Sequence, residues 1–198
     1  MTVENKTWFV SDLHFGHKNI IEYCDRPTTI EELDEWLINK LNSSISENDT
    51  VYHIGDFTLK SKNLEYIVSI VSKLNGNWNF VLGNHDDEKT LDKLCAAMPD
   101  KCKNLGWYHI YKTKKRKLIL HHFPHRSWQD ARNGSINVHG HCHGSLKGKE
   151  LHNQIDVGID ALDDFNPITL EQLIQIVDER NKNNEVVNHH EGQKTGNE

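Results

Sequence analysis

Apolar residues recur along this chain with two different spacings, which predict where its strands and helices lie. Short runs of apolar and β-branched residues predict strands in the first half of the chain at 7–11, 49–54 and 78–82. Between these runs, apolar residues spaced three and four apart predict helices at 17–23, 61–74 and 90–98, and a longer helix that starts near residue 30. Strands and helices therefore alternate through the first half.

The longer helix is expected to be amphipathic. Its apolar stripe consists of Ile30, Leu33, Leu37 and Leu41. Thr28 or Thr29 is the expected N-cap, because a hydroxyl there would accept a hydrogen bond from a free backbone N–H and glutamates follow in the first turn.

The second half of the chain is richer in strands than in helices. A β-hairpin is expected from the runs at 107–111 and 117–121, followed by strands at 135–139 and 151–157 and a last helix at 170–177. Beyond residue 178 the chain is polar and aperiodic. We therefore expect one domain over residues 1–178, an α/β fold with sheets covered by helices, and a flexible polar tail over residues 179–198.

Composition and charge narrow the classes of protein to which the chain can belong. With 198 residues, 36% of them hydrophobic and 26% charged, the chain can form a substantial globular core. Its net charge of −6 argues against broad electrostatic binding of nucleic acid, and the basic run at 112–117 is expected to be a solvated hairpin turn. No apolar run approaches the ~20 residues of a membrane span. We therefore expect no membrane partner. The four cysteines form no CxxC pair, so we expect the protein in a reducing cytoplasm.

Five short segments carry candidate chemistry, and each follows a run that is expected to be a strand. They are Asp12-Leu13-His14, Gly55-Asp56, Gly83-Asn84-His85-Asp86, His122 before Phe123-Pro124, and Gly140-His141-Cys142-His143. Because the ends of neighbouring strands converge, these side chains are expected to form one pocket. On an extended chain, residues two apart face the same way, so Asp12 and His14 could bind one cation, as could His141 and His143.

In this order, the segments resemble the signature of the calcineurin-like metallophosphoesterases. The match runs from about residue 8 to residue 177 and includes the Val157-Gly158-Ile159-Asp160 segment. The resemblance implies a four-layer α-β-β-α sandwich, in which two central β-sheets are flanked by helices. It also implies two divalent metals at the carboxyl ends of the strands.

The resemblance further implies a role for each signature residue. The first metal would be held by Asp12, His14, Asp56 and His143. The second would be held by Asp56, Asn84, His122 and His141, so that Asp56 bridges the two. His85 would contact the scissile phosphate and protonate the leaving group without binding metal, and Asp86 would orient it. His122 is chosen over His121 because the aromatic-proline pair follows it.

The candidate ligands offer oxygen and imidazole but no thiolate. Such a set suits Mn²⁺, Fe or Zn²⁺, and we expect Mn²⁺ first, with Fe, Zn²⁺ or Ni²⁺ as alternatives. Two divalent ions carry more positive charge than the carboxylates of Asp12 and Asp56 neutralise, and the remaining positive charge would attract a phosphate. It would also lower the pKa of a bridging water towards about 7, so that hydroxide attacks a phosphomonoester or phosphodiester in line.

Short loops between the segments predict an open pocket for a small phosphoester, with a nucleotide as one candidate. Candidate substrate contacts are Arg126, Trp128, Phe57 and His17, each of which has ordinary packing as its alternative. A nuclease acting on nucleic-acid ends is a less favoured reading because of the acidic charge. A non-catalytic scaffold of the same fold is a third possible function. The sequence contains His85 as well as every metal ligand, which argues against a scaffold. The sequence leaves the oligomeric state open.

Overall fold

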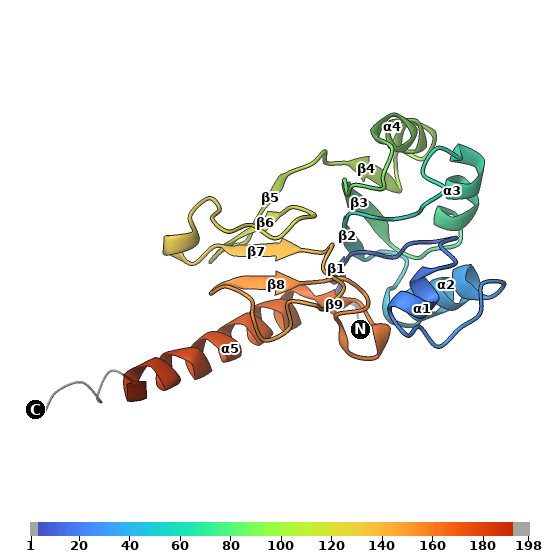
Figure 1. Cartoon of the computed structure of the whole chain (residues 1–198). Coiled ribbons are helices and arrows are strands. Elements are labelled where there is room, and N and C mark those ends of the chain that lie inside the picture. The colour runs from blue at the N-terminus through green and yellow to red at the C-terminus, as the bar shows by residue number, and fades with distance from the viewer. Residues whose placement is uncertain (1–3, 192–198) are drawn as a thin grey trace, which may run out of the picture.

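Two β-sheets lie at the centre of the molecule, with helices packed against them (Figure 1). This computed structural model describes the backbone of residues 4–191 and the side chains up to residue 183. The first sheet has the strand order β4-β3-β2-β1-β9. Its strands are β1 (Thr7–Val10), β2 (Thr50–Ile54), β3 (Asn77–Val81), β4 (Cys102–Asn104) and β9 (Ile168–Thr169). β1 to β4 are parallel, and β9 pairs antiparallel with β1.

The second sheet has the order β5-β6-β7-β8. Its strands are β5 (His109–Lys112), β6 (Lys117–Leu120), β7 (Ile136–His139) and β8 (Gln154–Asp156). β5 and β6 form the expected antiparallel hairpin, and the other neighbours are parallel. Since most strands in both sheets are parallel, their carboxyl ends gather at common edges, where the candidate segments follow them.

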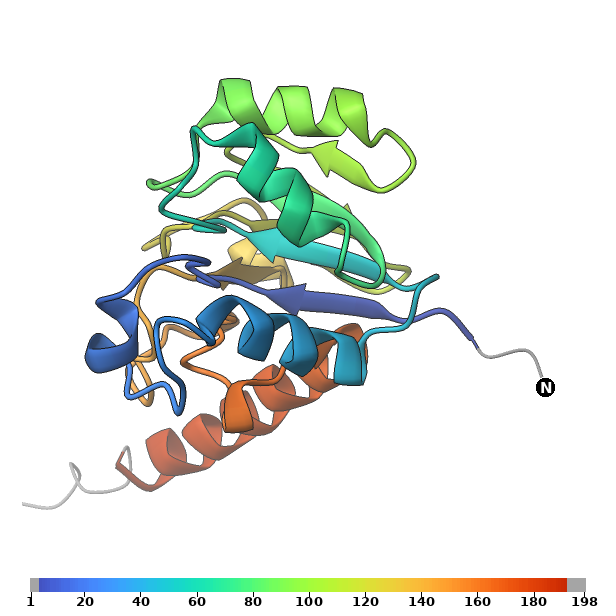
Figure 2. The ribbon, with the colours of Figure 1, turned by 90° about the vertical axis from the view of Figure 1, so that its right-hand side faces the viewer.

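Helices cover the outer face of the first sheet and one side of the sandwich. They are α1 (Ile20–Tyr23), α2 (Leu33–Ser44), α3 (Leu64–Val71), α4 (Glu88–Ala97) and α5 (Leu170–Glu191), with short 3-10 turns η1 (Ala131–Asn133) and η2 (Asp163–Phe165). Turning the molecule by 90° shows α2 and α3 lying across the first sheet (Figure 2). α5 lies against β8 and β9. The expected α/β fold of two sheets with flanking helices is confirmed.

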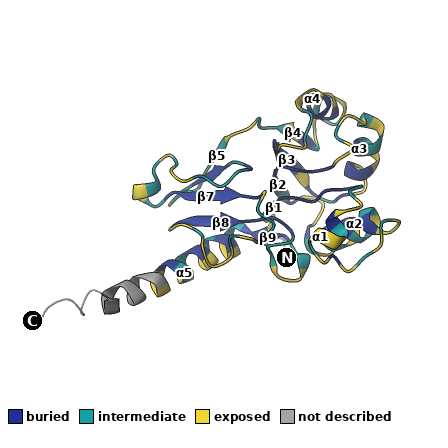
Figure 3. Cartoon of the chain, in the orientation of Figure 1, coloured by how far each residue is buried: buried dark blue, intermediate teal, exposed yellow. Residues whose placement is uncertain are grey.

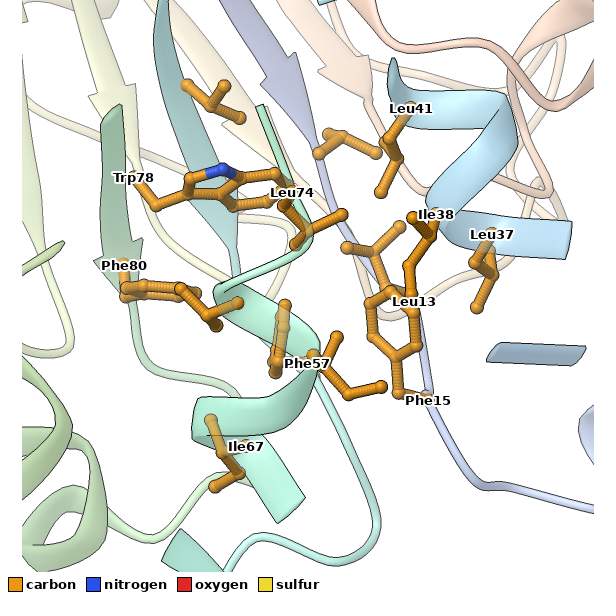
Figure 4. Packing of buried hydrophobic residues seen from close by; sticks show 14 of the residues in the cluster. Leu13, Phe15, Leu37, Ile38, Leu41, Phe57, Ile67, Leu74, Trp78 and Phe80 are labelled. Atoms are coloured by element: carbon orange, nitrogen blue, oxygen red, sulfur yellow. The ribbon is translucent and has the colours of Figure 1, made fainter. Parts of the chain in front are cut away.

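Two apolar layers hold these elements together, and both appear as buried residues on the strands (Figure 3). Strand alternation assigns side chains to them: Trp8 and Val10 face the helices, whereas Phe9 between them faces the second sheet. In the helical layer, Leu37 and Ile38 of α2 lie near Leu13 and Phe15, whereas Trp78 and Phe80 of β3 lie on the other side of the same cluster (Figure 4). The strands that carry the candidate segments are therefore anchored on both faces.

Three sequence expectations need correction. α2 begins at Leu33, and its N-cap is Glu32 without a capping side-chain hydrogen bond, so neither Thr28 nor Thr29 caps it. The short strands β4 and β9 were not expected, because they are only 3 and 2 residues long. The last helix does not end at 177 but continues to Glu191.

This longer helix changes the expectation of a tail that starts at residue 179. The Asn181 side chain is buried and donates a hydrogen bond of 2.8 Å to the Asn153 Oδ1. Residues 192–198 of the expected tail lie outside the described residues. No helix in the described part of the chain combines the length and the apolar character that crossing a membrane requires.

Candidate metal centre

The candidate ligands gather where strands from both sheets end. Asp12 and His14 follow β1, Asp56 follows β2, Asn84 follows β3, His122 follows β6, and His141 and His143 follow β7. The topology of parallel strands thus brings together side chains that are far apart in the sequence.

The first cluster consists of Asp12, His14 and His143. One ligand atom from each lies within 4.8 Å of the others. The Asp12 Oδ1 is 3.9 Å from the His14 Nε2 and 3.8 Å from the His143 Nε2. The three side chains therefore present a carboxylate and two imidazoles to one space that could hold a cation.

The second cluster consists of Asp56, His122 and His141, again with ligand atoms within 4.8 Å of one another. The Asp56 Oδ2 is 3.3 Å from the His122 Nε2 and 3.7 Å from the His14 Nε2 of the first cluster. This one carboxylate oxygen thus faces both clusters. Asn84 begins the exposed turn after β3, and its side chain makes no hydrogen bond with any residue that the structure describes.

Asp12 and His14 were expected to face the same way because they lie on an extended chain, and so were His141 and His143. The structure corrects this reason, because all four residues lie in turns. Asp12 and His14 have φ angles of 57° and 52°, and His141 and His143 have φ angles of 68° and 46°. Asp56 also lies in the left-handed region, at 59°. Non-glycine residues adopt this region at a cost and are held there by surrounding contacts, commonly at functional sites.

Unsatisfied buried nitrogens show that a cation fits these clusters. Both ring nitrogens of His14 and the Nε2 of His122 are buried, and none of them has a hydrogen-bond partner among the described residues. Burying a polar atom without a partner is costly, and a metal ion would use these lone pairs. Imidazole and carboxylate donors without thiolate match divalent ions such as Mn²⁺, Fe²⁺ or Zn²⁺.

The two buried carboxylates have opposite pKa shifts. Burial raises the pKa of Asp12 to about 7, although His122 and His143 act to lower it. Burial also acts to raise the pKa of Asp56, but the close approach and charge of His122 outweigh it and hold the pKa below its usual range. Burial lowers the pKa of His14 to about 3, so this imidazole is neutral and able to coordinate.

A comparison with known proteins supplies the family. A family model for calcineurin-like phosphoesterases matches residues 6–197 of the chain. The chain belongs to the calcineurin-like phosphoesterase family. Members of this family typically bind two metal ions, which agrees with the two His/Asp clusters.

Similar proteins include small archaeal, phage and bacterial ones. The uncharacterized protein MJ1445 of Methanocaldococcus jannaschii is 27% identical over 179 residues, which cover 87% of this chain and 92% of that protein. The gene 66 protein of Mycobacterium phage L5 is 29% identical over 187 residues, covering 79% and 87% of the two chains. The crystal structure of AQ665, a protein of unknown function from Aquifex aeolicus, superposes with a TM-score of 0.63 at 21% identity and covers 87% of this chain and all (100%) of its own.

In this calcineurin-like phosphoesterase, His85 lies at the open side of the clusters. Its side chain is 43% exposed, and its Nε2 is 3.9 Å from the Asp56 Oδ2. Its backbone N–H donates a hydrogen bond of 2.9 Å to the Asp56 Oδ1, and its ring lies 5.6 Å from that of His14. His85 is therefore next to both clusters while its ring remains accessible.

The observed contacts of Asp86 differ from those expected. Its carboxylate accepts hydrogen bonds from the backbone N–H groups of Asp56, Phe57 and Gly83, at 2.8–3.0 Å. It makes no hydrogen bond with the His85 ring among the described residues. Asp86 thus joins the turn after β2 to the turn after β3, and it positions His85 through the backbone.

The four expected substrate contacts differ in where they lie. The His17 ring is 5.3 Å from that of His14, so it borders the first cluster. Phe57 is 4% exposed and packs in the helical layer near Phe80 and Ile67, so it does not wall the pocket (Figure 4). The indole N–H of Trp128 donates a hydrogen bond of 3.2 Å to the Ser135 carbonyl. Arg126 is exposed on the same loop, and its side chain makes no hydrogen bond within the described residues.

The sequence analysis included Asp160 in the matched segment without giving it a role, and it did not single out Arg26; both residues support the first cluster from behind. The His143 Nδ1 is 2.8 Å from the Asp160 Oδ2 and 3.5 Å from the Cys24 Sγ, and Arg26 pairs with Asp160. Asp160 carried a usable signal, because it is another acid just after a strand-like run. Arg26 is one basic residue in a loop, and no sequence pattern distinguishes it.

Proposed function

We propose that this chain is a dinuclear metal-dependent hydrolase of small phosphomonoesters or phosphodiesters, with nucleotides as the first class of substrate to test. The observation that carries the proposal is the position of Asp56, whose Oδ2 faces both clusters, with the accessible His85 ring beside it. Membership of the phosphoesterase family and the unsatisfied nitrogens of His14 and His122 support it.

In the proposed reaction, each group has a separate task. Two divalent ions, Mn²⁺ in the first instance, would neutralise phosphate charge and make a water molecule more acidic. Asp12, His14, Asp56 and His143 would hold one ion. Asp56, Asn84, His122 and His141 would hold the other. His85 would contact the phosphate and donate a proton from its ring to the leaving oxygen, for which its exposed position beside Asp56 is suitable.

A small substrate is favoured over a polymer by two features. The net charge of −6 provides no broad attraction for a polyanion, so binding would depend on the ions themselves. His85 and His141 are exposed, so the clusters are accessible to a small phosphoester from solvent. His17 would line the side of this opening next to His14.

The test is hydrolysis of simple chromogenic esters by apo and metal-loaded protein. The protein is stripped with a chelator, reloaded with Mn²⁺, and assayed with p-nitrophenyl phosphate and bis-p-nitrophenyl phosphate. We expect hydrolysis of at least one ester after reloading and none before it. A folded protein that contains two ions per chain and hydrolyses neither ester would contradict the proposal. Nucleoside monophosphates, cyclic nucleotides and oligonucleotides, compared under the same conditions, then rank the substrate classes.

A further inference from the structure

A buried arginine lies directly behind the first cluster. Arg26 is 3% exposed, and its guanidinium forms two parallel hydrogen bonds with Asp160, from Nε to Oδ1 and from Nη2 to Oδ2, both at 2.8 Å. Such a bidentate pair is strong and fixes the orientation of both partners. The two residues are 134 positions apart in the sequence, so the pair ties the loop after α1 to the segment after β8.

The same guanidinium also holds the turn that carries Asp12 and His14. Its Nη1 donates to the Leu13 carbonyl at 2.7 Å, and its Nη2 donates to the Asp12 carbonyl at 2.8 Å. Asp12 and His14 both have positive φ angles, which non-glycine residues keep only when neighbouring contacts enforce them. Arg26 provides such contacts at this turn.

Asp160 in turn orients the third residue of the cluster. Its Oδ2 lies 2.8 Å from the His143 Nδ1, which leaves the His143 Nε2 facing the Asp12 Oδ1. A carboxylate behind an imidazole selects the tautomer whose other nitrogen can bind a metal. Cys24, His143 and Asp160 could themselves form a three-ligand group, but Arg26 already occupies both oxygens of Asp160. We therefore assign Asp160 to the support of His143.

The second cluster is held in a different way. The His122 Nδ1 donates to the Ile54 carbonyl at 2.8 Å, and Asp86 accepts from backbone N–H groups of the turns that carry Asp56 and Asn84. Among the described residues, Arg26 makes no hydrogen bond to this cluster. The buried Arg26–Asp160 ion pair therefore contacts residues of the first cluster and its turn, and it makes no hydrogen bond to the second cluster among the described residues.

We propose that Arg26 and Asp160 are positioning residues that maintain the affinity of the first cluster for its metal ion, while the second cluster binds its ion without them. The inference rests on the proposed function only in taking the clusters as metal sites, and it does not require hydrolysis. Removing a ligand's supporting carboxylate typically weakens metal binding by about 10–100-fold. The effect is expected at one site of two.

The experiment titrates apo protein with Mn²⁺, following binding by calorimetry and by electron paramagnetic resonance. The variants are Asp160→Asn, which keeps the shape but loses the charge, and Arg26→Lys, which keeps the charge but loses the planar fork. In each variant we expect one ion to bind with the wild-type affinity and the other to bind roughly 10–100-fold more weakly. The signal of a single isolated Mn²⁺ should then persist to higher metal concentration than in the wild type.

Asp178→Asn is the matched control, because it breaks another Arg–Asp contact, that of Arg116 Nη1 with Asp178 Oδ1 at 2.6 Å, on the partly exposed surface. It should leave both affinities unchanged. Equal weakening of both ions in Asp160→Asn and Arg26→Lys would overturn the proposal, as would no weakening at all. A protein that binds two ions in this pattern but hydrolyses no ester would contradict the proposed function and leave this inference intact.

A measurement on the unaltered protein covers the case in which the variants fail to fold. Nitrogen-15 spectra of the histidine rings, recorded with the diamagnetic ion Zn²⁺, report which nitrogen of His143 carries the proton. The proposal requires a protonated Nδ1 and a metal-shifted Nε2. A protonated Nε2 would refute it.

Discussion

The two clusters use the same kinds of ligand but are supported by different kinds of contact. The first is supported by charged side chains from distant parts of the chain, through Arg26 and Asp160. The second is supported mainly by backbone groups, through the Ile54 carbonyl and the N–H groups that meet Asp86. We therefore expect substitutions of Arg26 or Asp160 to act on the first cluster, whereas the turns of the second cluster depend on the Asp86 carboxylate and on backbone groups.

Asp56 belongs to both clusters, so a change at this residue should affect the two clusters alike. Asp56→Asn removes the charge that faces His14 and His122, so both ions should be lost together. If each ion contributes about 3 kcal/mol to transition-state stabilisation, the rate should fall on the order of 10⁴-fold. Metal content per chain and ester hydrolysis measure the two effects. Asp164→Asn, at an exposed carboxylate that pairs with Lys40, is the control and should change neither.

His85 should affect the chemistry of both clusters and the metal occupancy of neither. His85→Ala removes the proposed proton donor and phosphate contact, so turnover should fall roughly 10²-fold or more at unchanged metal content. His152→Ala, at an exposed histidine on another loop, is the matched control. Loss of an ion from His85→Ala would show that this residue is a ligand, contrary to the role given to it.

Two glycines lie against the carboxylates on which the clusters depend, Asp12 and Asp56. A Cβ at Gly140 would overlap the Asp12 carboxylate, and a Cβ at Gly83 would overlap the Asp56 carboxylate. We expect Gly140→Ala to weaken one ion and Gly83→Ala to weaken both, since Asp56 is shared. Each variant should also lower the free energy of unfolding by about 1–3 kcal/mol through overpacking.

Titration with Mn²⁺ and unfolding in urea test the glycine prediction. Gly148→Ala serves as the control because its Cβ would meet open space, although its positive φ also carries some strain. The sharing of Asp56 would be refuted if Gly83→Ala released only one ion.

The smallest expected effect concerns His53, on the strand that leads to Asp56. His53 is fully buried among aromatic rings, and burial lowers its pKa from 6.5 to about 3. As the pH falls below 6.5, the unfolded chain binds a proton here before the folded protein does, so stability is lost between pH 6.5 and about 3. This group alone should remove about 2 kcal/mol of stability between pH 7 and pH 5.

The substitution His53→Leu should abolish that contribution. Urea unfolding of apo wild type and variant at pH 7 and pH 5 measures it, and the variant should lose less stability than the wild type. Equal losses would mean that His53 is not buried in its neutral form.

Strand ends could be predicted from the sequence, and with them most of the candidate site. Apolar runs located β1, β2 and β3, and parallel topology then brought Asp12, Asp56 and Asn84 to one edge. The turn geometry could not be predicted, because the positive φ of Asp12 and His14 depends on contacts from elsewhere in the fold. The apolar pattern of the sequence therefore predicted which residues are candidate ligands, but it did not predict the backbone conformation of the turns that carry them.

Residues that act through long-range polar contacts were the ones the sequence did not reveal. Arg26 supports the first cluster through its ion pair with Asp160, which is distant in the sequence. No local sequence pattern predicts such a long-range pair. Phe57 was placed near the pocket by its position after Asp56, yet its ring turns into the core. The polar segment after residue 178 read as a tail, but Asn181 makes a buried hydrogen bond with Asn153 that no apolar periodicity could indicate.

If the two clusters share Asp56, they should together bind a pair of metal ions. Titration of the apo wild-type protein with Mn²⁺, followed by electron paramagnetic resonance, tests it most directly. We expect two ions per chain whose spectra show magnetic coupling through the shared carboxylate. Binding of one ion, or of two ions with independent spectra, would contradict it.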